Sequence, residues 1–210
     1  PGFQPFDMEC YTERLAEAQD FCKAEALELQ VLQGAEIAWT YQVPMALRQG
    51  KVPTIGGTDY VLLELWRNVS WQAAADAADQ LIRAGYCPVL AHPERYFCVQ
   101  DTPELLYEFR EMGAVLQINK GSVFGRFGEE AERTARFLLE NRLAGCVASD
   151  AHGADYRTTD MRPVRQFLEE RYGEAYAQLL VKVNPRRILE DRQIFYEPSP
   201  ERKRKRRWFL

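Results

Sequence analysis

The sequence predicts an α/β fold in which parallel strands alternate with helices. Short apolar runs of strand length alternate with helical patterns along most of the 210 residues. Polar residues suited to chemistry stand at the ends of five apolar runs, at intervals of 28, 28, 27 and 31 residues: Glu36, Glu64, His92, Asn119 and Asp150. That spacing is the length of one strand-plus-helix unit. Apolar runs with polar tips are typical of buried parallel strands that carry function at their carboxyl ends.

The individual elements follow from this periodicity. An opening helix is predicted over residues 7–27, because Leu15, Ala18, Cys22 and Ala26 recur at steps of three and four. Five strands are predicted at residues 30–37, 60–66, 88–92, 114–119 and 146–149. Helices are predicted between and after them at residues 70–84, 102–112, 129–141, 161–172 and 174–180, with a shorter one before Ile188.

Two architectures remain open for these five strands. In a barrel, the five polar tips would converge on one mouth, but closure takes about seven or eight strands. In an open sheet, the strand over residues 30–37 would leave an exposed edge. Only helices are predicted after residue 149, so we expect that the missing strands of a barrel belong at the N-terminal side.

The composition is that of an ordinary globular domain. It is 46% hydrophobic and 28% charged, and the net charge of −4 gives no reason to expect nucleic acid as a partner. No apolar stretch approaches the roughly 18 residues that span a bilayer. Five cysteines, none in a Cys-x-x-Cys pair, favour a reducing cytoplasm: Cys10, Cys22, Cys87, Cys98 and Cys146.

Both histidines stand in polar segments at the ends of predicted strands. His92 lies in Ala91-His92-Pro93-Glu94-Arg95-Tyr96, and His152 in Ser149-Asp150-Ala151-His152. Histidine, carboxylate and guanidinium are the groups that a phosphate-cleaving metal site needs. The alternative is structural, because loops begin with polar residues and a single histidine is often a hydrogen-bonded core residue. Glu64 fits that alternative poorly, because an unpaired carboxylate between Leu63 and Leu65 is costly inside a fold.

Five segments in this order resemble one known family. They are Gly34-Ala35-Glu36-Ile37, Tyr60-Val61-Leu62-Leu63-Glu64, the segment from Val89 to Tyr96, Ser149-Asp150-Ala151-His152 and Asn184-Pro185-Arg186. Together they resemble the bacterial manganese-dependent protein-tyrosine phosphatases of the polymerase-and-histidinol-phosphatase (PHP) superfamily, which regulate capsular and exopolysaccharide synthesis. The resemblance covers roughly residues 34–188. It implies a distorted seven-stranded barrel around a cluster of divalent metal ions, within a PHP-type domain over residues 1–195.

The resemblance also implies roles for individual residues. Five fall on metal-ligand positions of the family, with Glu64 at the position of its bridging carboxylate: Glu36, Glu64, His92, Asp150 and His152. Arg95 and Arg157 match arginines that hold phosphate, which suits a planar guanidinium that binds two oxygens at once. The implied catalytic residues are therefore Arg95, Arg157 and Glu64, and the implied cofactor is Mn²⁺ or another divalent ion.

The chain departs from the family pattern in two places. The family opens with a His-x-His pair and carries another histidine after its second strand, and neither is present here. We therefore expect a domain that lacks the first one or two strands of the barrel. The family also often has a histidine after the strand that ends at Asn119, where this chain has Lys120. Lys120 is predicted either to place a positive charge near the mouth or to be solvated.

The implied activity is hydrolysis of phosphotyrosine on a bacterial tyrosine kinase that controls capsule or exopolysaccharide synthesis. A cysteine-based mechanism is not predicted, because no cysteine opens a Cys-x₅-Arg loop. Two alternatives remain open. One is a PHP-type phosphoesterase for a small molecule such as histidinol phosphate. The other is a non-catalytic protein that binds a phosphorylated kinase tail through Arg95 and Arg157.

The C-terminal residues 196–210 form a predicted basic tail. Arg202 to Arg207 are consecutive basic residues, followed by Trp208 and Phe209. The tail is predicted to be disordered and solvated, or to contact anionic lipid as a peripheral anchor at the inner membrane face. No fold element supports nucleic-acid binding through it.

Overall fold

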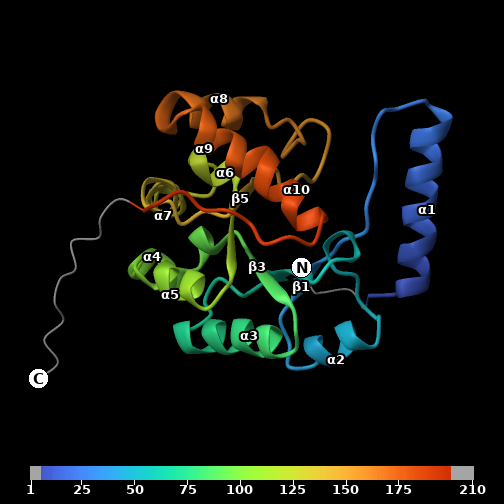
Figure 1. Ribbon diagram of the computed structural model, residues 1–210, viewed down its shortest axis with the longest axis horizontal. Coiled ribbons are helices and arrows are strands. Elements are labelled where there is room, and N and C mark those ends of the chain that lie inside the picture. The colour runs from blue at the N-terminus through green and yellow to red at the C-terminus, as the bar shows by residue number, and fades with distance from the viewer. Residues whose placement is uncertain (1–5, 200–210) are drawn as a thin grey trace, which may run out of the picture.

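The computed structural model describes residues 6–199, in which five parallel strands form one sheet (Figure 1). The strands pair in chain order, each with the next. Their bounds are Glu36–Ala38 (β1), Tyr60–Glu64 (β2), Cys87–Ala91 (β3), Val115–Asn119 (β4) and Cys146–Ala148 (β5). The predicted α/β class with parallel strands is confirmed. Within the described residues β1 and β5 are the two edges of the sheet, so these five strands do not close a barrel.

Helices connect the strands and flank them. The helices are Met8–Ala24 (α1), Val43–Arg48 (α2), Trp71–Arg83 (α3), Phe97–Asp101 (α4), Leu105–Glu111 (α5), Lys120–Val123 (α6), Glu129–Glu140 (α7), Arg162–Tyr172 (α8), Glu174–Gln178 (α9) and Asn184–Leu189 (α10). Shorter helical turns cover Ile55–Gly57 (η1), Pro93–Arg95 (η2) and Leu179–Val183 (η3). In Figure 1, α1 stands apart from the strands at one side of the molecule.

The ends of the long helices follow from local capping. The Asp7 carboxylate accepts hydrogen bonds from the backbone N–H groups of Glu9 and Cys10, and the Ser70 hydroxyl accepts one from Ala73 N. These bonds satisfy N–H groups that have no partner inside the helix. The predicted helices over residues 7–27 and 70–84 are confirmed within a few residues.

The first predicted strand was misplaced. The sequence pattern favoured residues 30–37, but β1 covers only Glu36–Ala38. The backbone before β1 is bonded to side chains of α1 instead, because Tyr11 Oη exchanges hydrogen bonds with both backbone groups of Gly34 and Gln19 donates to Val31 O. Glu36 therefore begins its strand rather than ending it, while the other four strands lie within two residues of their predicted bounds.

The two faces of the sheet pack into two apolar clusters. Val61, Leu63, Leu90 and Leu116 belong to the larger cluster, which includes residues of the surrounding helices. The alternate residues belong to a smaller cluster that Ile188 and Ile194 complete: Tyr60, Val89, Val115 and Cys146. Because side chains alternate along a strand, Glu64 and Asn119 continue the face of the smaller cluster toward the carboxyl ends. Apolar packing fills one end of this face and polar residues occupy the other.

The C-terminal segment covers part of the molecule before it leaves the described range. Tyr196 packs against the smaller cluster, Glu197 pairs with Arg142 at 3.1 Å, and the Ser199 hydroxyl donates to Asn141 O. The basic residues Arg202 to Arg207 lie outside the described residues. Within residues 6–199, no helix has the length and apolar character needed to cross a membrane.

Candidate metal centre

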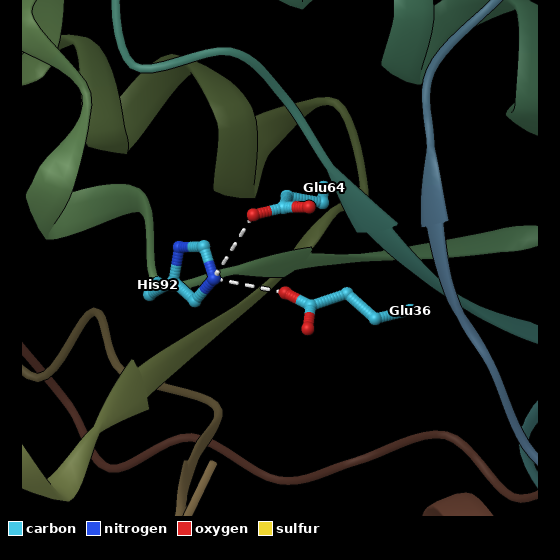
Figure 2. Close-up of side chains that lie close together, drawn as sticks. All are labelled: Glu36, Glu64 and His92. Carbon is cyan, nitrogen blue, oxygen red and sulfur yellow. Dashed lines mark hydrogen bonds and ion pairs between the residues drawn. The ribbon is translucent and has the colours of Figure 1, made fainter. Parts of the chain in front are cut away.

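Three predicted metal ligands from neighbouring strands meet at one point (Figure 2). His92 Nε2 lies 2.8 Å from Glu36 Oε1 and 3.7 Å from Glu64 Oε1, and the three ligand atoms all lie within 4.8 Å of one another. Carboxylate oxygens and imidazole nitrogens bind divalent ions at about 2.0–2.2 Å. Two ligand atoms of one ion are therefore about 4.4 Å apart at most, and both distances from His92 Nε2 lie within that limit. The group also has the donor chemistry of a divalent-metal site.

The sheet register brings the two carboxylates together. Ala38 pairs with Glu64 and Glu36 pairs with Leu62, so Glu36 and Glu64 point from the same face of adjacent strands. His92 follows the last residue of β3 and has a left-handed backbone with φ of 37°. Two other predicted site residues, Asp150 and Arg157, also have positive φ. Such conformations are strained for non-glycine residues and tend to cluster at functional sites.

The environment acts on the two carboxylates in opposite directions. Burial raises the pKa of Glu36, but its hydrogen bond with His92 and the charges of His92 and Arg95 lower that pKa below its ordinary value overall. The pKa of Glu64 is raised by burial and by the neighbouring Glu36 carboxylate. A cation between the two carboxylates would offset both their repulsion and the cost of burying them.

The imidazole of His92 is oriented by its surroundings. Its Nε2 faces the carboxylates, while its buried Nδ1 has no hydrogen-bond partner among residues 6–199. The segment after His92 is fixed by Tyr96, whose hydroxyl donates to Ala91 O at 2.8 Å and accepts from Leu65 N at 3.3 Å. This buried hydroxyl ties the end of β3 to the end of β2, and it explains why a tyrosine follows the His-Pro-Glu-Arg segment.

A second group surrounds Asp150, which follows β5. Asn119 Nδ2 donates to Asp150 Oδ2 at 2.5 Å, and Arg157 forms an ion pair with the same oxygen. Arg95 Nη1 lies 3.9 Å from it. His152 Nδ1 lies 3.5 Å from Asp150 Oδ1, but the His152 side chain is 56% exposed. Asp150 and His152 thus lie outside the group of three ligand atoms, and their roles as metal ligands stay predictions.

Two predicted phosphate-binding arginines share an aromatic neighbour that the sequence motifs did not indicate. The guanidinium carbons of Arg95 and Arg157 lie 4.6 and 5.5 Å from the ring centroid of Phe127. Gly121 leaves room for this ring, since a Cβ there would lie 2.7 Å from Phe127 Cε2. The only local signal in the sequence was the pair of glycines around Phe127, Gly125 and Gly128. Both have positive φ, as a tight loop requires.

Two polar residues next to predicted site residues support the loops of the site. The Glu94 side chain is fully buried and accepts hydrogen bonds from Asn119 N and the Ser122 hydroxyl. Lys120 is also buried, and its ammonium group donates to the carbonyls of Thr158 and Asp160. The expectation of a solvated Lys120 was therefore wrong, because the loop after β5 closes over its side chain.

The fold and the site together define an α/β protein with a candidate metal centre at the carboxyl end of a parallel sheet. Residues 5–190 match the family described as capsular polysaccharide synthesis, CpsB/CapC. The chain belongs to this family. The family match confirms the resemblance that the five sequence segments indicated.

Individual relatives agree with this assignment. The chain is 30% identical over 191 residues to tyrosine-protein phosphatase CpsB of Streptococcus pneumoniae, covering 89% of this chain and 79% of that protein. It is 32% identical over 182 residues to tyrosine-protein phosphatase YwqE of Bacillus subtilis, covering 87% and 71%. A crystal structure from work on YwqE and CpsB, described as metal-dependent tyrosine phosphatases, superposes with a TM-score of 0.82 at 31% identity. The match covers 91% of this chain and 77% of that one.

Proposed function

We propose that the chain is a metal-dependent protein-tyrosine phosphatase. Its substrate is phosphotyrosine on a bacterial tyrosine kinase that controls capsule or exopolysaccharide synthesis. The observation that carries the proposal is the grouping of Glu36, Glu64 and His92 within reach of Arg95, in the fold of the CpsB/CapC family. The relatives named as tyrosine phosphatases support the choice of substrate.

Glu36, Glu64 and His92 Nε2 would hold a divalent ion, for which we propose Mn²⁺. Asp150 and His152 would complete the centre on its other side. A bound divalent ion activates water for attack and neutralises charge on a phosphoryl group. Glu64, whose pKa is raised by burial and by the neighbouring Glu36 carboxylate, would hold the ion from the end of β2.

The arginines would bind and orient the phosphoryl group. Within the described residues, the Arg95 guanidinium makes no hydrogen bond, and its Nε is buried without a partner. Contact with Phe127 holds the guanidinium while leaving its N–H donors for an anion. Arg157 donates from Nε to Asp150 O and pairs with the Asp150 carboxylate, so its position is more strongly fixed. The two guanidiniums would stabilise the negative charge that develops on phosphoryl oxygens.

The finer architecture and location belong to the same proposal. A seven-stranded barrel would need further strands beyond the open edges of the described sheet, beside β1 or β5. Cytoplasmic location suits the five cysteines, none of which forms a disulfide in the structure. Contact of Arg202 to Arg207 with anionic lipid at the inner membrane face stays a prediction.

The test is phosphate release from a phosphotyrosine peptide, with Mn²⁺ and with chelator. We expect turnover that needs Mn²⁺ and is lost in His92→Ala. Faster turnover of histidinol phosphate than of the peptide would contradict the proposed substrate. Peptide binding without turnover in folded, Mn²⁺-loaded protein would favour the non-catalytic alternative.

A further inference from the structure

A pocket opens beside the candidate metal centre, where β1 and β2 end. Its volume is about 180 Å³, and we call it the aryl pocket. It is lined by Ala38, Glu64, Leu65, Trp66, Arg67 and Arg95. We propose that the aryl pocket receives the aromatic ring of phosphotyrosine and that Trp66 determines this specificity. The inference rests on the proposed function and names the part of the substrate that the site recognises.

The position of the pocket relates it to the reacting group. Glu64 belongs to the candidate metal centre and Arg95 is the arginine with unused donors, and both line the pocket. A phosphoryl group bound by Arg95 and by an ion on Glu64 would place its ester substituent at the pocket. The alcohol part of the ester, which leaves when the phosphate is released, would therefore contact the other residues that line the pocket.

The lining has the chemistry that an aryl group needs. Ala38 and the buried Leu65 provide apolar surface, and Trp66 is 61% exposed. An apolar cavity of roughly 150 Å³ is large enough to hold benzene, so the aryl pocket has room for one ring. Aromatic rings pack well against indole in offset or edge-on arrangements. The short side chain of phosphoserine would leave this surface uncovered, so the pocket favours phosphotyrosine.

The segment that carries Trp66 is held at both sides. Leu65 N donates to the buried Tyr96 hydroxyl, and Arg67 O accepts from Phe97 N at 2.8 Å. Glu64 O accepts from Trp39 N at 3.0 Å, which joins the ends of β1 and β2. The Arg67 guanidinium also lies over the Phe97 ring at 5.1 Å. A wall fixed in this way binds its ligand with little loss of conformational freedom.

Two phosphonates that resist hydrolysis separate ring recognition from phosphoryl recognition. Binding of phenylphosphonate and of methylphosphonate to the full chain loaded with Mn²⁺ is measured by calorimetry. The unsubstituted protein is expected to prefer phenylphosphonate. Trp66→Ala is expected to weaken phenylphosphonate binding by roughly 10-fold, or about 1.4 kcal/mol, with methylphosphonate binding unchanged. Trp66→Phe keeps an aromatic wall and is expected to retain most of the preference.

The matched control is Tyr41→Ala. Tyr41 is 78% exposed and follows β1, but it does not line the aryl pocket, so its removal is expected to change neither affinity. Equal weakening of both ligands by Trp66→Ala, or of neither, overturns the inference, as does an unsubstituted protein without preference for the phenyl ligand. A preference that depends on Trp66, in a protein that releases no phosphate from peptide, upholds the pocket and contradicts only the proposed catalysis.

Discussion

The two sides of the candidate site carry opposite balances of charge. On the side of β1 to β3, Glu36 and Glu64 share only the imidazole of His92, and no arginine or lysine of the described chain lies within 4.0 Å of either carboxylate. On the side of β4 and β5, one carboxylate, Asp150, is contacted by Arg157, and Arg95, which follows β3, lies 3.9 Å from it. On the first side two carboxylates have no arginine or lysine partner, so the charge there is negative overall. On the second side two guanidiniums face one carboxylate, so the charge there is positive overall.

This difference suggests a division of work between the two sides. Two neighbouring carboxylates without an arginine or lysine beside them repel each other, and a divalent ion would compensate their charge. Guanidiniums that outnumber their carboxylates are suited to an incoming anion. A phosphoester between the two sides would thus contact a metal ion on one side and arginine donors on the other. The following variants test whether the sides are separable.

The largest effect is expected from His92→Ala. Loss of residues that merely support a metal ligand costs about 10–100-fold in metal affinity, so loss of a ligand should weaken Mn²⁺ binding by at least about 100-fold. Titration calorimetry on the purified chain measures this. His152→Ala is the comparison, because the proposed ligand His152 is exposed and lies outside the group of three ligand atoms, and we expect a smaller loss. Equal losses in both variants would show that His152 holds the ion as strongly as His92 does, and would contradict the division of the site into a metal side and an arginine side.

Arg95→Ala should have the next largest effect, on catalysis rather than on metal binding. Removing one donor that stabilises developing charge typically costs about 100-fold or more in rate. We expect kcat/KM for a phosphotyrosine peptide to fall by about 100-fold, while Mn²⁺ affinity stays within about twofold. Arg95→Lys keeps the charge but loses the planar pair of donors, and should recover only part of the rate. A loss of Mn²⁺ affinity similar to that of His92→Ala would contradict the division.

Strand periodicity in the sequence predicts which side chains lie together at the carboxyl ends of the strands. Glu64 and His92 stand at the ends of apolar runs, and in a parallel sheet such ends share one edge. Glu36 lies close to both of them, as the prediction of a shared site requires. Its strand was nevertheless misplaced, because side chains of α1 bind the backbone before β1. The apolar pattern of a segment predicts its secondary structure, but it does not show hydrogen bonds that side chains elsewhere in the sequence make to its backbone.

The ion pair of Asp150 with Arg157 and the contacts of Phe127 with the two arginines could not be predicted from the sequence. Both depend on how the loops after β4 and β5 pack on each other, and loop conformation is set by tertiary contacts rather than by local pattern. The buried Lys120 illustrates this, because its hydrogen bonds to Thr158 and Asp160 hold a loop almost forty residues away. A lysine in a polar segment is usually exposed.

Phe127→Leu should have a moderate effect restricted to the arginine side. The ring contacts both guanidiniums, and a cation–π contact is worth roughly 0.5–2 kcal/mol. We expect the inhibition constant for inorganic phosphate to rise by about fivefold, with Mn²⁺ affinity unchanged. Phe124→Leu is the matched control from the same loop, since Phe124 packs on Phe167 and not on the arginines. Equal effects of the two variants would mean that the loop, and not the contact with the guanidiniums, sets phosphate affinity.

Glu94→Gln should have the smallest effect, although Glu94 is the most buried carboxylate near the site. Glu94 lies between His92 and Arg95 in sequence, and its Oε1 accepts both of its hydrogen bonds, while Oε2 has no partner within residues 6–199. Burial raises its pKa, so the charged form gains little from its surroundings. A glutamine keeps the acceptor oxygen, and we expect the free energy of unfolding in urea to change by less than about 1 kcal/mol.

Glu94→Ala removes the acceptor and leaves Asn119 N and the Ser122 hydroxyl without it, so the expected cost is about 2–3 kcal/mol. If Glu94→Gln lowers the free energy of unfolding as much as Glu94→Ala does, then the negative charge of Glu94 stabilises the fold. Glu94 would then belong to the negatively charged side of the site. If glutamine is tolerated with Mn²⁺ affinity intact, Glu94 joins the two sides through hydrogen bonds alone. The negative charge that attracts the metal ion then resides on Glu36 and Glu64.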